Sequence, residues 1–179
     1  MLKLFTYFII PVFTIYLAIQ GDLFGTNLSG ICSRDSLQHL FILWAITVAG
    51  FSYYVLTCIV KKYHLRFQRP LYVIITTSSI LLLLSSLLPY LPRLHPLLSQ
   101  LHMLFAFSST MLLLLLLFII SWQLCRRNSD KYRRFFLLCI GIDLISFSIL
   151  LGVGIISGFL EIFITISCTC LSTKLLLYE

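Results

Sequence analysis

Two histidines and a glutamate have the side chains in this sequence that are best suited to chemistry. Imidazole and carboxylate groups bind metal ions and transfer protons. His39, His102 and Glu161 each lie at one end of a strongly apolar stretch. Their spacing matches no local metal-binding motif, so a shared site requires separate elements to bring them together.

Asp143 is a second candidate because it lies in the middle of an apolar stretch, in "GIDLISFS". A carboxylate at such a depth in a membrane costs several kcal/mol unless it is neutral or paired. Ser146 follows three residues later, which places it on the same face of a helix. The pair is interpreted either as a hydrogen-bonded contact between helices or as a proton- or ion-linked group.

The composition shows what must position these groups. Apolar residues make up 60% of the 179 residues and charged residues 11%, against about 25% charged residues in a soluble domain. Apolar runs such as "MLLLLLLFIISW" recur along the whole chain. The sequence therefore predicts an all-α integral membrane protein with a single domain, residues 1–179.

Six stretches are long and apolar enough to be membrane spans of about 20 residues. A cleaved signal peptide is the alternative for the first stretch, but "IQGDLFG" offers a poor cleavage site. The predicted spans are residues 4–20, 37–60, 71–88, 97–124, 135–156 and 159–177.

Basic residues set the predicted orientation. Two connections, "KKYHLRFQR" and "RRNSDKYRR", hold nine Lys and Arg residues, and with Lys3 and Lys174 eleven of the thirteen fall on one side of a six-span arrangement. Because Lys and Arg accumulate in cytoplasmic loops, both termini are predicted to be cytoplasmic and the membrane to be the cell membrane. The net charge of +7 is thus explained by topology and does not indicate nucleic-acid binding.

This topology places His39, His102 and Glu161 in one layer, at the outer boundary of the membrane, with Arg93 and His95 nearby. Three interpretations remain open. The side chains could simply be solvated at the interface, they could bind a lipid headgroup or another amphiphile, or they could form a metal or hydrolytic site.

Nothing in the sequence resembles a nucleotide-binding loop, a nucleophile elbow or a cysteine redox centre, and no cofactor or bound metal is predicted. The six cysteines contain no C-x-x-C pair and are expected to be free thiols. We favour a non-catalytic protein that binds a lipid, an amphiphile or a membrane partner (another protein or a second copy) through the outer polar pocket, in envelope maintenance, regulation or immunity. The alternatives are a lipid-modifying enzyme using the two histidines and Glu161, and a small proton-linked transporter or transporter subunit using Asp143.

Two motifs resemble those of the six-helix FRAG/DRAM/Sfk superfamily and its prokaryotic relatives of unknown function. In "LLPYLPRLHPLLSQLHMLFAF" a proline-containing outer turn precedes a histidine near the start of the fourth helix, with His102 as the better match. In "SGFLEIF" Gly158 and Glu161 open the last helix. The resemblance implies six helices and a possible involvement with membrane lipids, and it implies no settled activity.

Overall fold

The computed structural model describes residues 1–33 and 37–178, and the described residues contain helices and no β-strand. The all-α prediction is therefore confirmed. The elements are α1 (Leu2–Leu4), η1 (Phe5–Ile9), α2 (Ile10–Ala18), α3 (Leu28–Cys32), α4 (Gln38–Lys62), α5 (Gln68–Leu87), α6 (Pro96–Arg127), α7 (Ser129–Val153) and α8 (Gly158–Leu177).

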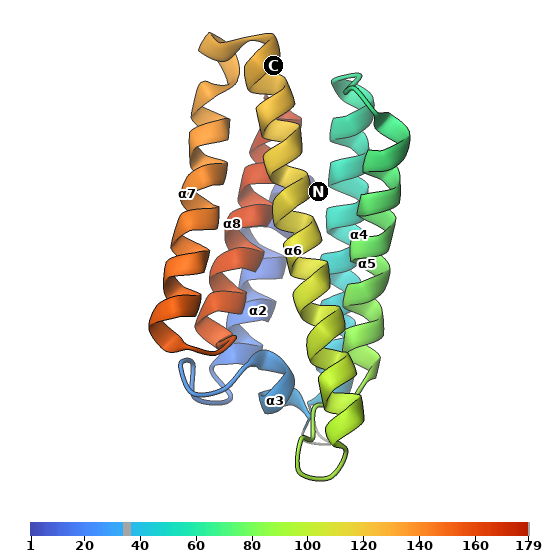
Figure 1. The fold of residues 1–179 in the computed structure, drawn as a ribbon, viewed down its shortest axis with the longest axis vertical. Helices are drawn as coiled ribbons and strands as arrows, with labels where there is room; N and C mark the ends of the chain where they lie inside the picture. Colours follow the sequence, from blue (N-terminus) through green and yellow to red (C-terminus); the bar gives the residue numbers. More distant parts are fainter. Residues whose placement is uncertain (34–36, 179) are drawn as a thin grey trace.

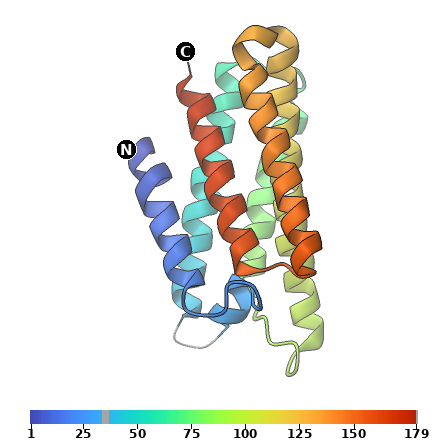
Figure 2. The ribbon, with the colours of Figure 1, turned by 90° about the vertical axis from the view of Figure 1, so that its left-hand side faces the viewer.

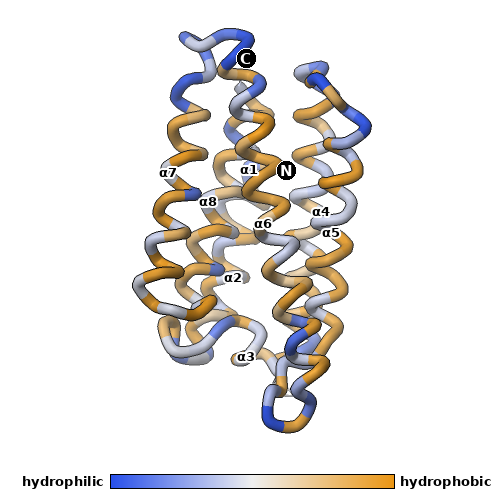
Figure 3. Tube along the Cα trace, viewed as in Figure 1, coloured by the Kyte–Doolittle hydropathy of each residue, from blue (hydrophilic) through white to orange (hydrophobic). Residues whose placement is uncertain are grey.

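Five of these helices, α4 to α8, are long and apolar enough to cross a membrane, and the continuous helix Leu2–Ala18 is shorter. The chain is thus a multi-pass membrane protein. At 1.5 Å per residue, the 32 residues of α6 extend well beyond a hydrocarbon layer of about 30 Å. Figure 3 shows the corresponding pattern, with long hydrophobic stretches between two hydrophilic ends.

The fourth predicted loop differs most from the structure. "RRNSDKYRR" is almost entirely helical, because α6 continues to Arg127 and α7 already begins at Ser129. The turn is made by Asn128, which has extended φ and ψ angles and whose side chain accepts a hydrogen bond from the Lys131 N–H. Such an N-cap allows a helix to start six residues before its apolar part.

The first helix contains one irregular turn. Residues 5–9 form a π-helical turn immediately before Pro11. Proline has no N–H to donate to the preceding turn, so the local hydrogen-bond pattern must change. Thr6 Oγ1 and Thr173 Oγ1 lie 2.8 Å apart, and Trp44 Nε1 donates to Thr14 Oγ1 at 2.8 Å. These contacts attach the first helix to α8 and α4.

The long helices form a ring in the order α4, α5, α6, α7, α8, with α8 again packed on α4, and α2 lies outside this ring against α4 and α8. Figures 1 and 2 show the helices running nearly parallel to one another. Ser109 Oγ donates to the Ser78 carbonyl at 2.8 Å and Ser78 Oγ to the Ser109 carbonyl at 2.9 Å. This reciprocal pair joins α5 to α6 in the middle of the bundle.

The bundle has two different ends. We call the end that carries α3 and the connection between α5 and α6 the α3 end, and the end that carries residues 61–69 and 125–134 the basic end. Gly154 ends α7 at the α3 end with φ +76°, a conformation that favours glycine. Both chain termini lie toward the basic end (Figure 2).

At the basic end, cationic side chains donate hydrogen bonds to the backbone carbonyl groups at the C-terminal ends of helices. Lys62 Nζ donates to the carbonyls of Leu176 and Tyr178 at 2.8 and 2.9 Å. Arg127 donates to the carbonyls of Tyr63 and His64. Cations at helix C-termini satisfy carbonyls that have no partner within the helix.

Candidate functional site

The connection between α2 and α4 covers the α3 end of the bundle. We call its described part, residues 19–33, the cap segment. The Gly158 N–H donates to the Thr26 carbonyl at 2.8 Å, and the Phe159 N–H donates to the Leu23 carbonyl at 2.9 Å. A Cβ atom on Gly158 would lie 3.4 Å from that Thr26 oxygen, so glycine allows the close approach. The cap segment is thereby joined to the start of α8.

Glu161 makes a further connection to the cap segment. Its Oε2 accepts a hydrogen bond from the Leu28 N–H at 2.6 Å. Leu28 is the first residue of α3, where the backbone N–H has no partner within the helix. The Asn27 side chain caps the same short helix by accepting from the Gly30 N–H at 2.7 Å. One carboxylate and one amide therefore fix the position of α3.

His102 is only 2% exposed and uses both of its ring nitrogens. Nδ1 lies 2.9 Å from the Leu88 carbonyl oxygen, and Nε2 lies 2.7 Å from Ser29 Oγ. The Tyr90 ring packs against the imidazole, with 5.6 Å between ring centroids, and the Tyr90 N–H donates to Ser33 Oγ. His102 thus joins α6, the end of α5 and the cap segment.

The structure brings His102 and Glu161 to two adjacent residues of α3, Ser29 and Leu28. The other three candidates lie elsewhere. His39, Arg93 and His95 are exposed at the α3 end, the last two in the hydrophilic connection before α6, which projects furthest in Figures 1 and 3. Arg34 and Asp35, expected beside the second span, lie outside the described residues.

Ser29 was not predicted as a site residue from the sequence. It lies in "NLSG", where the Asn27 cap is the one signal that a helix begins. A helix of five residues is too short to show apolar periodicity. No sequence pattern indicates that it contacts a histidine 73 positions later.

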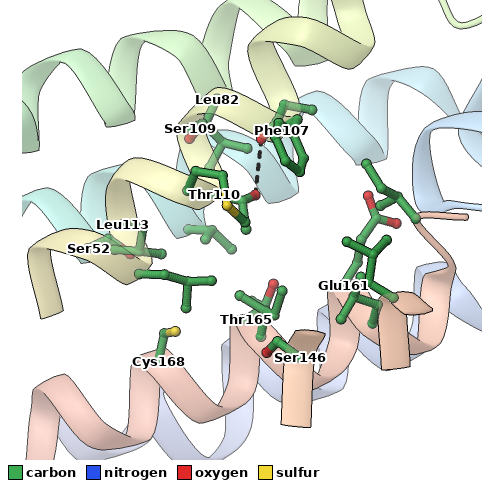
Figure 4. Close-up of a pocket in the computed structure, with 18 of the residues that line it drawn as sticks. Ser52, Leu82, Phe107, Ser109, Thr110, Leu113, Ser146, Glu161, Thr165 and Cys168 are labelled. Carbon is green, nitrogen blue, oxygen red and sulfur yellow. Dashed lines mark hydrogen bonds between the residues drawn. The ribbon is translucent and has the colours of Figure 1, made fainter. Parts of the chain in front are cut away.

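A cavity of about 600 Å³ lies inside the helix ring, next to α3. Ligand pockets in proteins have volumes of about 300–1,000 Å³. Figure 4 shows Glu161, Thr165 and Cys168 of α8 on one side of it, with Phe107, Thr110 and Leu113 of α6 opposite. Glu161, Thr165 and Cys168 lie at helical spacing on one face of α8 and line the cavity, and Ser172 on the same face is buried.

The lining of the cavity is mostly apolar, and it contains several polar groups. Ser29 of the cap segment and Glu161 are polar groups at the α3 end of the cavity, and apolar side chains together with further polar ones, among them Thr110 and Asp143, line it along the helices. Its charged residues are Asp143 and Glu161, and none of the described lining residues is Lys, Arg or His. The cavity can therefore hold an apolar group, with Ser29 and Glu161 as a polar end near α3.

Part of the cavity wall is not covered by other protein. Phe107, Met111 and Leu115 of α6 and Leu144 and Phe147 of α7 all line the cavity, and each is 40–62% exposed. The two helices meet at Asn128 and diverge toward the α3 end (Figure 1). A side opening between them connects the cavity to the apolar surface of the bundle, where lipid chains lie in a membrane.

Asp143 and Ser146 lie on the α7 side of this cavity. Asp143 Oδ1 and Ser146 Oγ are buried and have no hydrogen-bond partner among the described residues. The nearest polar contact of the carboxyl group is Cys139 Sγ, 4.0 Å from Oδ2. Unpaired buried polar atoms are costly, so these two atoms favour a ligand or a water molecule in the cavity.

Within residues 1–33 and 37–178, no group of three His, Cys, Asp or Glu side chains is placed to hold a metal ion. Cys32 lies in α3 and is buried; burial, and to a lesser extent the Glu161 carboxylate, raises the pKa of its thiol to about 12. The thiol is therefore protonated at neutral pH and is a poor nucleophile.

Searches with this chain against family models, curated proteins and solved structures found no match. Any functional conclusion about this protein must therefore come from the geometry of the site.

Proposed function

We propose that this protein binds the apolar chain of a lipid or another amphiphile in the cavity between α6, α7 and α8. One observation carries the proposal: a cavity of about 600 Å³ with a mostly apolar lining opens through the side of the bundle. A ligand that dissolves in the membrane can enter by this route without crossing water. Burial of apolar surface supplies the affinity, at roughly 25 cal/mol per Å².

The polar end of the cavity favours an amphiphile over a plain hydrocarbon. Ser29 and Glu161 lie next to the cap segment, and an amphiphile could place its polar group there while its chain extends along α6 and α8. Asp143 and Ser146 provide further acceptors part of the way along. This arrangement supports ligands that donate hydrogen bonds, since acidic and hydroxyl groups supply the polar lining.

We further propose six membrane crossings with the basic end in the cytoplasm of a cell whose plasma membrane holds the protein. The basic residues gathered at one end support this orientation, and the helix Leu2–Ala18 would make the sixth crossing. The α3 end and the polar end of the cavity then lie in the outer leaflet. Membership in the FRAG/DRAM/Sfk superfamily remains part of this proposal.

The ligand proposal can be tested with Trp44, which lines the cavity and is 5% exposed. The only other tryptophan, Trp122, is 42% exposed. In a Trp122→Phe variant, Trp44 is thus the only tryptophan and reports on the cavity. We expect a fatty alcohol with a brominated chain, whose hydroxyl group can donate to the polar acceptors of the cavity, to quench Trp44 fluorescence in a saturable way.

A matched pair of substitutions controls this experiment. Thr165→Phe fills the cavity from α8 and should abolish the quenching. Ile145→Phe adds the same ring on α7 at a position that is 49% exposed and does not line the cavity, so quenching should persist. If Trp44 is not quenched, or if Thr165→Phe changes nothing, the cavity does not bind an apolar chain.

The transporter alternative has its own observation, the buried Asp143 Oδ1, which has no hydrogen-bond partner among the residues that the structure describes. A proton-linked carrier requires this carboxyl group to bind and release a proton. Uptake into vesicles should then depend on pH and be lost in Asp143→Asn. If saturable Trp44 quenching is retained in the same variant, ligand binding does not require the Asp143 carboxyl group.

A further inference from the structure

The contact between Ser29 and His102 gives the cavity a second possible role beyond binding. We propose that Ser29 is a nucleophile and His102 its general base, and that together they cleave an acyl ester whose chain lies in the cavity. This inference rests on the proposed binding function, because it requires the chain to enter the cavity.

The hydrogen bonds define the protonation of the imidazole. A carbonyl oxygen only accepts hydrogen bonds, so the contact between Nδ1 and the Leu88 oxygen requires the proton to be on Nδ1. Nε2 then has a free lone pair, and the Ser29 hydroxyl, 2.7 Å away, donates to it. A neutral histidine with its free nitrogen on a serine hydroxyl, and its other nitrogen held by an acceptor, is the arrangement that activates a nucleophilic serine.

Both partners are held in place by contacts that do not depend on their hydrogen bond. Tyr90 packs on the His102 ring, and Leu88 fixes its orientation from the end of α5. Ser29 lies on α3, which Asn27 and Glu161 hold through the bonds to Gly30 and Leu28. Such rigid positioning of the reacting groups is a requirement for catalysis.

The position of Ser29 matches the position of an ester. Ser29 lines the α3 end of the cavity, and a mostly apolar wall with some polar side chains continues from it. Esters of membrane lipids lie at the interface, with their acyl chains in the hydrocarbon layer. A chain that enters between α6 and α7 and extends toward the middle of the bundle would therefore bring its ester carbonyl to the level of α3.

The reaction consumes one ester and one water molecule. Ser29 Oγ bonds to the carbonyl carbon and its proton moves to His102 Nε2; the ester C–O bond then breaks, and the leaving alcohol takes that proton. Water next bonds to the acyl carbon and gives a proton to Nε2, after which the bond between the acyl group and Ser29 breaks. Ser29 Oγ regains the proton, and a fatty acid leaves.

A long-chain alkyl fluorophosphonate tests this proposal on the intact protein in detergent micelles. The serine oxygen displaces fluoride from phosphorus, so the product is a stable adduct that peptide mass spectrometry can locate. We expect the adduct on Ser29 of the wild-type protein, and we expect His102→Gln to slow its formation at least about 100-fold, the low end of a general base's contribution. A long-chain nitrophenyl ester should show the matching loss of hydrolysis.

Thr26→Ala is the control for the cap segment, because Thr26 Oγ1 donates to the Asp22 carbonyl within the cap segment and contacts neither Ser29 nor His102. It should label at the wild-type rate. Mapping of the adduct on the wild-type chain keeps the test valid if His102→Gln does not fold. An absent adduct on Ser29 in protein whose Trp44 is quenched would overturn the nucleophile and leave the binding function standing. Equal labelling of His102→Gln would overturn the role of His102 as base.

Discussion

The two ends of the bundle are both rich in polar groups, but they use them differently. At the basic end, Lys62 and Arg127 donate to backbone carbonyls at helix ends, and three tyrosines and a phenylalanine pack around the same turns. At the α3 end, His102 and Glu161 contact one short helix that borders a cavity. The polar groups of the basic end complete the helices, whereas those of the α3 end surround a space.

This difference shows that a cluster of ionisable residues does not identify a site by itself. The basic end has the higher charge, but Lys62, Arg127 and Lys131 contact carbonyl groups and aromatic rings of their own chain. The α3 end has fewer charges, yet Glu161 and Ser29, the partner of His102, line a cavity that is large enough for a ligand. The difference between the two ends depends on the cap segment, and substitutions can disrupt this segment selectively.

The largest expected effect is on cysteine reactivity. Because the pKa of the Cys32 thiol is raised to about 12, its thiolate fraction at pH 8 should be about a thousandfold below that of an unperturbed cysteine. Maleimide should therefore modify Cys32 far more slowly than the partly exposed Cys125 near the basic end. Mass spectrometry of peptides from the wild-type protein measures both rates, and fast modification of Cys32 would show that the cap segment is open.

Loss of the Glu161 carboxylate should be the next largest effect. Glu161→Leu introduces an apolar side chain of similar size and leaves the Leu28 N–H without its acceptor. The free energy of unfolding should therefore fall by about 1–3 kcal/mol. Thermal unfolding in detergent measures the change. Glu161→Gln, which retains an acceptor oxygen, is the matched control and should lie closer to the wild type than Glu161→Leu.

Widening of the side opening should have a smaller effect, on affinity. Phe147→Ala removes an apolar side chain from the cavity lining and should weaken binding of the brominated fatty alcohol about tenfold, equivalent to roughly 1.4 kcal/mol. Ile145→Ala, two residues away and outside the lining, should have no effect on binding. Equal effects of the two substitutions would show that the chain does not enter between α6 and α7.

The smallest effect is expected at the basic end. Lys62→Met keeps the apolar part of the side chain and removes the ammonium group that donates to Leu176 and Tyr178. Because this contact is exposed, the loss of stability should be below about 1 kcal/mol, and Trp44 quenching should remain unchanged. A loss comparable to that of Glu161→Leu would remove the difference between the two ends.

Several features followed from the sequence because they depend on local composition. The six apolar stretches that were predicted to be spans correspond to the five long helices α4 to α8 and to the shorter helix Leu2–Ala18, since the hydrocarbon layer requires continuous helix. Pro96 begins α6, a position that suits proline because its missing N–H costs nothing at the first position of a helix. The inward face of α8 was also predictable, from the helical spacing of Glu161, Thr165 and Cys168.

Only the tertiary structure decided which polar groups meet. His39 and His102 looked alike in the sequence, but His39 is exposed and His102 is buried against Ser29, since the direction of a side chain depends on how its helix is rotated in the bundle. The cap segment has no periodicity from which its fold over α8 could be predicted. Composition and periodicity thus determined the helices, and long-range packing determined the cavity, its side opening and the contact between Ser29 and His102.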